Sequence, residues 1–135
     1  MARKHAVLSA SSAARWIACP PSARLNAEKS DTPSEYAAQG TDAHTLCEYK
    51  LRKALGERVR DPTKHLTSYD TEMEECAEAY CQFVMELVGQ FRDESKDTMV
   101  SVEQRVDFSA FVPEGFGTTD TLIISGKTVC IVDYK

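Results

Sequence analysis

The C-terminal stretch of the chain, residues 117–135, reads GTTDTLIISGKTVCIVDYK. Two short runs rich in β-branched residues flank Ser-Gly-Lys, and this pattern is typical of a β-hairpin. If the loop is the pair Gly126-Lys127, glycine takes the first central position, as a type II′ turn requires. The stretch therefore predicts two antiparallel strands joined by a tight turn.

The register of this hairpin determines which side chains meet. A two-residue loop pairs Ser125 with Thr128, and counting outwards places Asp120 directly opposite Asp133. Opposed residues on one face have Cβ atoms roughly 5 Å apart, and strand alternation puts Lys135 on the same face as Asp133. Two carboxylates and an ammonium group are then expected to converge. A three-residue loop would shift the register by one and break this pairing.

Two functions fit such a group of charges. Neighbouring carboxylates repel each other unless a positive charge lies between them, and Mg²⁺ binds carboxylate oxygens while keeping water and phosphate oxygens as further ligands. A lysine nearby could position a water molecule or neutralise developing charge. The alternative is a surface hairpin with solvated charges. Spacing alone does not separate the two, because Asp-x-Lys is short and common.

The composition is that of one ordinary globular domain. The chain has 135 residues, of which 42% are hydrophobic and 27% charged, and its net charge is -5. This charge argues against a generic nucleic-acid coat protein. However, residues 1–60 hold ten Lys and Arg against six Asp and Glu, whereas residues 61–135 hold six against fifteen. A basic half fits a protein that meets phosphates on one side, although chance could produce the same imbalance.

The cysteines and the apolar residues indicate in which cellular compartment the protein is expected. The five cysteines include no CxxC pair, no long apolar run is present, and the N-terminus has no apolar signal region. We therefore expect reduced thiols in a cytoplasmic protein that does not contact a membrane. Cys76 and Cys81 are five residues apart, which does not place them well on one helical face, so both are expected to be packing residues.

Helical patterns precede strand patterns along the chain, which predicts an α+β fold. Helices are expected over residues 13–18, from 35 or 41 to 55, and from 70 or 71 to 91, with a strand over 98–108 before the hairpin. His44 lies on a stripe with Glu48, Leu51 and Leu55, at the end where this core-facing stripe becomes polar. By this pattern alone, His44 is more simply a histidine at the rim of the core or a core histidine with its hydrogen bonds satisfied.

Several short motifs occur in a fixed order. They are Gly40-x-x-x-His44, Glu103, Gly117-x-x-Asp120 and Asp133-Tyr134-Lys135, preceded by Ser9-x-Ser11 and Cys19-Pro20. Together they resemble the RecB-like branch of the PD-(D/E)XK nuclease superfamily, in particular an uncharacterised group of phage- and prophage-encoded proteins. The resemblance covers nearly the whole chain.

The resemblance implies a role for each matching residue. Asp120 and Asp133 would bind a metal ion and, with Lys135, form the catalytic group. His44 would be the additional metal ligand of the RecB-like branch, and the backbone carbonyl of Tyr134 would complete the metal shell. The implied cofactor is Mg²⁺ or Mn²⁺. Glu103 would belong to a strand motif in a supporting role, but alternation places it with Arg105 on the polar face, where a solvated or ion-paired glutamate is the alternative.

The chain departs from the family pattern in two ways. The family's Gln-x-x-x-Tyr helix usually follows the lysine strand, so we expect a restriction-endonuclease-like core truncated after its third strand. Residues 1–135 would form this single domain, with a helical part over 1–97 and a β-meander with the metal site over 98–135. Cys19 matches the first iron–sulfur cysteine of some members, but no cysteine follows Cys130. We therefore expect no iron–sulfur cluster and interpret Cys19 as a buried thiol.

The resemblance implies a metal-dependent deoxyribonuclease, an exonuclease acting at DNA ends in phage recombination or repair. No base-reading motif is evident, so its DNA contacts would not depend on sequence. Candidates for DNA backbone contacts are Arg15, Arg24, Lys50, Arg52 and Lys53, for which a solvated helix face is an equal alternative. The alternative function is a non-catalytic DNA-binding or assembly module. Further candidate partners are a second copy of the chain, which would complete the sheet, and a recombination partner protein. The expected compartment is the cytoplasm of a bacterial host.

Overall fold

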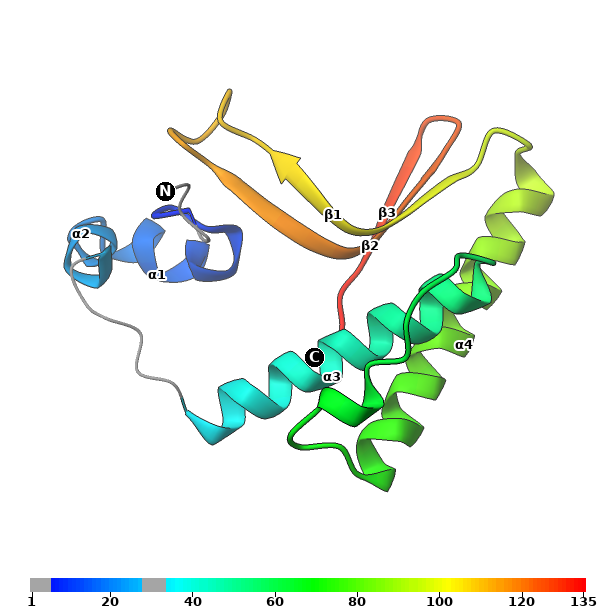
Figure 1. Cartoon of the computed structure of the whole chain (residues 1–135). Helices are drawn as coiled ribbons and strands as arrows, with labels where there is room; N and C mark the ends of the chain where they lie inside the picture. Colours follow the sequence, from blue (N-terminus) through cyan, green and yellow to red (C-terminus); the bar gives the residue numbers. More distant parts are fainter. Residues whose placement is uncertain (1–5, 28–33) are drawn as a thin grey trace. The chain divides into compact units, whose positions relative to one another are not determined.

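The computed structural model describes residues 6–27 and 34–135 (Figure 1). The chain divides into two compact units. The first, called here the N-terminal unit, comprises Met1–Thr32 and Arg105–Thr118, and the second, the main unit, comprises Pro33–Gln104 and Thr119–Lys135. Each unit is described by itself below.

The N-terminal unit contains the short helices η1 (Ala10–Ser12), α1 (Ala13–Ala18) and α2 (Pro21–Ala27). The indole Nε1 of Trp16 donates a hydrogen bond to the Ser9 carbonyl oxygen at 2.9 Å, and the Ser9 and Ser12 hydroxyls lie 2.8 Å apart. These contacts fold the residues before α1 back onto the helix. Cys19, at the C-terminal end of α1, is exposed, so the expectation that it is buried is wrong.

The main unit is built on two long helices that lie side by side, α3 (Glu35–Ala54) and α4 (Thr71–Glu94) (Figure 1). The Ser34 hydroxyl accepts a hydrogen bond from the Ala37 amide, and the Asp70 carboxylate accepts one from the Met73 amide at 2.7 Å. Both are N-cap contacts, which satisfy amides that no helical carbonyl reaches. The short helix η2 (Thr63–His65) lies in the connection between α3 and α4.

Three strands follow the helices: β1 (Met99–Asp107), β2 (Phe116–Ser125) and β3 (Thr128–Val132), in the sheet order β1-β2-β3. Strands β2 and β3 are antiparallel, with Ser125 opposite Thr128, and Gly126 has a φ of 56°. Lys127 keeps a negative φ, as the second central residue of a type II′ turn should. The predicted α+β class and the two-residue hairpin loop are therefore confirmed.

One face of the sheet packs on the helices. Val102 and Ile123 are buried against Leu51 of α3 and Val84 and Val88 of α4. A second cluster near the N-terminal halves of α3 and α4 includes Ala43, Leu46, Cys47, Met73 and Ala77, with Tyr80 and Tyr134 packed against it. This arrangement fixes α3 against the strands, so that His44 faces the end of the hairpin.

The outward face of the β2–β3 hairpin is apolar. Leu122 lies opposite Ile131, and Ile124 lies opposite Val129, with Val129 and Ile131 about 60% exposed (61% and 60%). Among the helices that the structure describes, none combines the length and apolar character needed to cross a membrane.

Candidate metal centre

His44 and Asp120 meet where α3 faces the end of β2. The His44 Nδ1 atom lies 3.3 Å from the Asp120 Oδ1 atom. His44 is carried by a helix that the core holds through the adjacent Ala43 and Leu46, both buried. The packing of one helix therefore brings a residue from position 44 to a carboxylate at position 120.

Glu103 is the third member of the group. One ligand atom from each of His44, Glu103 and Asp120 lies within 4.8 Å of the others. Glu103 has a φ of 52°, a left-handed conformation that non-glycine residues rarely adopt, inside strand β1. This local break interrupts the regular alternation of the strand, and Glu103 is half-buried beside His44 and Asp120. Glu103 therefore does not lie on a regular polar face with Arg105, which was the basis for the alternative of a solvated or ion-paired glutamate.

Arg52 supports the strand at this break. Its guanidinium Nη2 donates to the carbonyl oxygen of Val102 at 3.0 Å, one residue before Glu103. The same guanidinium contacts Glu48 through Nε and Glu57 through Nη1, at 2.8 and 3.0 Å. Sequence reasoning missed this role, because nothing in the pattern of β1 marks a left-handed residue that needs a donor from α3.

Asp120 is held in place by groups around it. The Tyr134 backbone amide donates to the Asp120 Oδ2 atom at 2.7 Å, which leaves Oδ1 directed at His44. The neighbouring Thr121 is fully buried, and its hydroxyl lies 2.8 Å from the Tyr80 hydroxyl. The Tyr134 ring makes edge contacts with the rings of both His44 and Tyr80. Asp120 and His44 are thus oriented by packed aromatic rings and a backbone hydrogen bond.

The carboxyl groups at the site have shifted pKa values. Burial raises the pKa of Asp120, and the charge of Asp133 adds to this effect. Burial also raises the pKa of Glu103, with further contributions from the charges of Asp120 and Glu48. Like charges held together out of water favour protonation or a bound cation. The group therefore has the electrostatic character of a cation site.

Asp133 and Lys135 lie at the edge of this group. Continuing the β2–β3 register places Asp133 opposite Asp120. The Lys135 ammonium lies 3.0 Å from Asp133 Oδ2, and the side chains are 85% and 47% exposed, respectively. Although burial raises the pKa of Asp133, the contact with the Lys135 ammonium lowers it overall. Asp133 is not one of the three residues with ligand atoms within 4.8 Å, whereas Glu103 is.

The donor set fits a divalent cation. Two carboxylates and one imidazole offer oxygen and nitrogen ligands, with no thiolate among them. Carboxylates suit Mg²⁺ and Mn²⁺, and an imidazole nitrogen favours a transition metal over Mg²⁺. Cys47 is buried near the site, and burial raises its thiol pKa to about 12, so it stays protonated at neutral pH. Cys81 is buried as predicted, whereas Cys76 is exposed, so its predicted packing role is wrong.

Two of the basic residues considered for DNA contacts are occupied by ion pairs. The Lys50 ammonium lies 2.7 Å from Glu74 and 2.8 Å from Glu78, and the two salt bridges join α3 to α4. Arg52 is engaged with Glu48 and Glu57, as described above. Both residues therefore have structural roles in the main unit.

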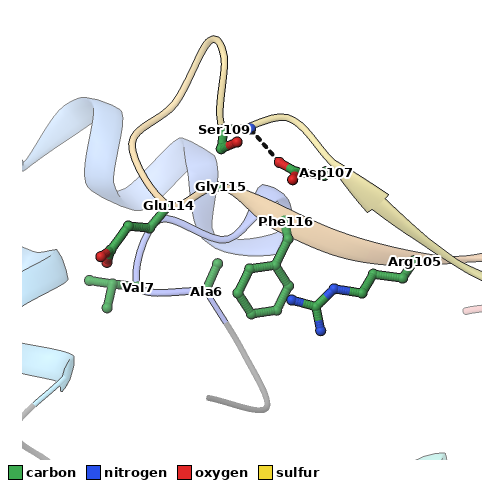
Figure 2. A pocket seen from close by; sticks show the side chains of 8 residues that line it. All are labelled: Ala6, Val7, Arg105, Asp107, Ser109, Glu114, Gly115 and Phe116. Atoms are coloured by element: carbon green, nitrogen blue, oxygen red, sulfur yellow. Dashed lines mark hydrogen bonds between the residues drawn. The ribbon is translucent and has the colours of Figure 1, made fainter. Parts of the chain in front are cut away.

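The N-terminal unit contains a separate cavity of about 370 Å³. Figure 2 shows Arg105 beside the ring of Phe116, and the guanidinium carbon lies 3.9 Å from the ring centroid. Asp107 and Glu114 also line this cavity, and none of the predicted site residues does. Its mixed charges do not select one class of ligand.

Comparison with known proteins gives a family for the chain. A family profile described as "Protein of unknown function (DUF2800)" matches residues 5–135. The chain belongs to this family. No solved structure matches it significantly.

Proposed function

We propose that this DUF2800 protein is a Mn²⁺- or Mg²⁺-dependent deoxyribonuclease of the RecB-like type, acting at DNA ends in phage recombination or repair. The observation that carries the proposal is the convergence of His44, Glu103 and Asp120, whose ligand atoms lie within 4.8 Å of one another. The order of the motifs around these residues supports the nuclease assignment, and the oxygen and nitrogen donors support the choice of metal.

The three converging side chains would hold the ion. A divalent ion supplies Lewis-acid polarisation of a phosphodiester and lowers the pKa of a coordinated water molecule. The chain's own contribution is orientation, because the Tyr134 amide fixes Asp120 and the packed α3 fixes His44. Such prior orientation removes the cost of ordering these groups when the substrate binds.

Lys135 and Asp133 would act next to the ion. The exposed Lys135 ammonium, 3.0 Å from Asp133, is placed where it can neutralise charge that develops on a phosphate. Asp133, with its lowered pKa, stays ionised at neutral pH and keeps Lys135 in position. In this proposal Asp133 orients Lys135 and does not itself bind the metal ion.

Degradation of linear DNA tests the proposal. Purified protein with Mn²⁺ should shorten linear duplex DNA and leave covalently closed circular DNA intact, because the proposed enzyme acts at ends. Lys135→Ala should reduce the rate by about 100-fold or more, whereas Lys127→Ala, at the exposed hairpin turn, should match wild type.

Three results would count against parts of this proposal. Equal rates for Lys135→Ala and wild type would remove the catalytic assignment of Lys135. Equal cleavage of linear and circular DNA would contradict action at ends. DNA binding with no hydrolysis under any divalent ion would favour a non-catalytic DNA-binding module.

A further inference from the structure

A second cavity lies beside α3 in the main unit. It has a volume of about 220 Å³ and is lined by Thr45, Glu48, Tyr49, Arg52, Val59, Arg60 and Pro62. One of these residues, Arg52, also donates a hydrogen bond to the Val102 carbonyl oxygen, one residue before Glu103. The cavity therefore adjoins the side of the centre where Glu103 lies.

The connection after α3, residues 56–66, is called here the basic loop. It presents Arg58, Arg60 and Lys64 as exposed side chains, and Lys53 is exposed in the last turn of α3. In the described part of the chain, Arg58 and Arg60 form no ion pair, in contrast to Lys50 and Arg52 of α3. These loop cations keep their charge available for a ligand.

The carboxylates near the cavity are already engaged. Glu48 and Glu57 both contact Arg52, at 2.8 and 3.0 Å. The Asp61 Oδ1 atom accepts hydrogen bonds from the amide and the hydroxyl of Thr63, at 2.9 and 2.7 Å. The Thr63 donors are neutral and leave the Asp61 charge in place, and Arg52 offsets only one of its two glutamates. The exposed Lys53, Arg58, Arg60 and Lys64 outnumber these remaining negative charges, so the local surface favours an anionic ligand.

Tyr49 adds a neutral donor at the cavity wall. Its hydroxyl oxygen accepts from the Lys53 ammonium at 3.4 Å, so its own O–H proton is directed to another acceptor.

From these observations we propose that the cavity and the basic loop bind the phosphate backbone of duplex DNA, with Arg60 and Tyr49 contacting a phosphate. The choice of DNA as the polyanion rests on the proposed function. The contacts involve phosphates alone, so binding here is independent of base sequence.

The experiment measures binding of a fluorescein-labelled 20-base-pair duplex to the full chain by anisotropy, without divalent ions and at several salt concentrations. Arg60→Gln should weaken binding roughly three- to tenfold and lower the slope of log K against log salt by about 1. The double variant Arg58→Gln/Arg60→Gln should lower both the affinity for the duplex and the salt slope further. Lys127→Gln, which removes one exposed charge from the hairpin turn of the same unit, is the matched control and should match wild type.

Equal binding by Arg60→Gln and wild type would overturn the inference, and so would the absence of duplex binding by wild type. An equal loss in Lys127→Gln would also overturn it, because net charge would then explain the effect. Mn²⁺ binding by the same variants separates this result from the proposed function. Arg60→Gln should bind Mn²⁺ as wild type does. Failure of wild type to bind Mn²⁺ would contradict the proposed metal centre, whereas the phosphate-binding surface would still be judged by the anisotropy measurements.

Discussion

At the scale of single residues, the conformation of Glu103 is the least expected feature. A left-handed backbone costs a non-glycine residue about 1–2 kcal/mol, and Glu103 pays this cost inside a strand. Arg52 holds the adjacent Val102 carbonyl, and the conformation delivers a carboxylate to His44 and Asp120. Backbone strain of this kind is typical of residues whose position serves a site.

Replacing Glu103 by glycine tests this interpretation. Glycine adopts a φ of 52° without strain, and the change removes a carboxylate with a raised pKa, so Glu103→Gly should raise the free energy of unfolding of the metal-free protein by about 1 kcal/mol. Urea denaturation measures this, and the same variant should lose Mn²⁺ binding. Glu114→Gly is the matched control, because Glu114 has a φ of 53° in the N-terminal unit.

The control variant should gain similar stability and bind Mn²⁺ as wild type does. If Glu103→Gly were destabilised while Glu114→Gly was stabilised, Glu103 would contribute more to the fold than to the site.

At the scale of elements, α3 connects the site to the rest of the main unit. Besides His44, it carries Asp42, whose Oδ2 atom accepts hydrogen bonds from the Thr67 and Ser68 amides, at 2.7 and 2.8 Å, and from the Thr67 hydroxyl. One carboxylate therefore ties the segment before α4 to the helix that holds His44.

Removing this carboxylate should destabilise the main unit in a pH-dependent manner. The Ser68 amide, followed by burial in the opposite direction and by Thr67, lowers the pKa of Asp42 below its ordinary 3.8. A lowered folded-state pKa means that the stabilisation is present above the ordinary value and is lost as pH falls through the folded value. Asp42→Ala should therefore cost about 1 kcal/mol at pH 7, and the difference from wild type should shrink below pH 4.

Urea denaturation between pH 7 and pH 3 measures this dependence, with Asp97→Ala as the control for removal of an exposed aspartate. A difference between Asp42→Ala and wild type that stayed constant down to pH 3 would show that the carboxylate charge is not what ties the segment to α3.

The elements differ in how far sequence predicts them. The hairpin register follows from local chemistry, because Gly126 fits one turn type and that turn fixes the opposition of Asp120 and Asp133. The approach of His44 to Asp120 is expected from the family resemblance. The helix pattern alone favours a histidine at the rim of the core. The placement of Glu103 beside His44 and Asp120 does not follow from alternation, because alternation assumes a regular strand, whereas Glu103 has a positive φ next to the Val102 carbonyl that Arg52 contacts. The exposure of Cys19 and Cys76 likewise depends on packing, which local sequence does not determine.

At the scale of the whole molecule, the basic excess of residues 1–60 and the acidic excess of residues 61–135 each divide into groups with different surroundings. Part of the basic excess of residues 1–60 has structural roles: Lys50 forms ion pairs that join α3 to α4, and Arg52 donates a hydrogen bond to the Val102 carbonyl of β1. Another part, in the basic loop, is exposed. The acidic excess of residues 61–135 includes Glu103, Asp120 and Asp133 around the metal centre. Net charge alone therefore says little about the ligand, whereas the local arrangement distinguishes the proposed cation site from the proposed anion-binding surface.

The most direct test of the metal centre is a Mn²⁺ titration of the full chain by calorimetry at neutral pH, comparing wild type with Asp120→Asn. Asparagine keeps the size of the side chain and removes the charge that lies 3.3 Å from His44. We predict that wild type binds one Mn²⁺ per chain and that Asp120→Asn loses this binding while remaining folded by circular dichroism. Failure of wild type to bind Mn²⁺, or equal binding by wild type and Asp120→Asn, would contradict the metal centre.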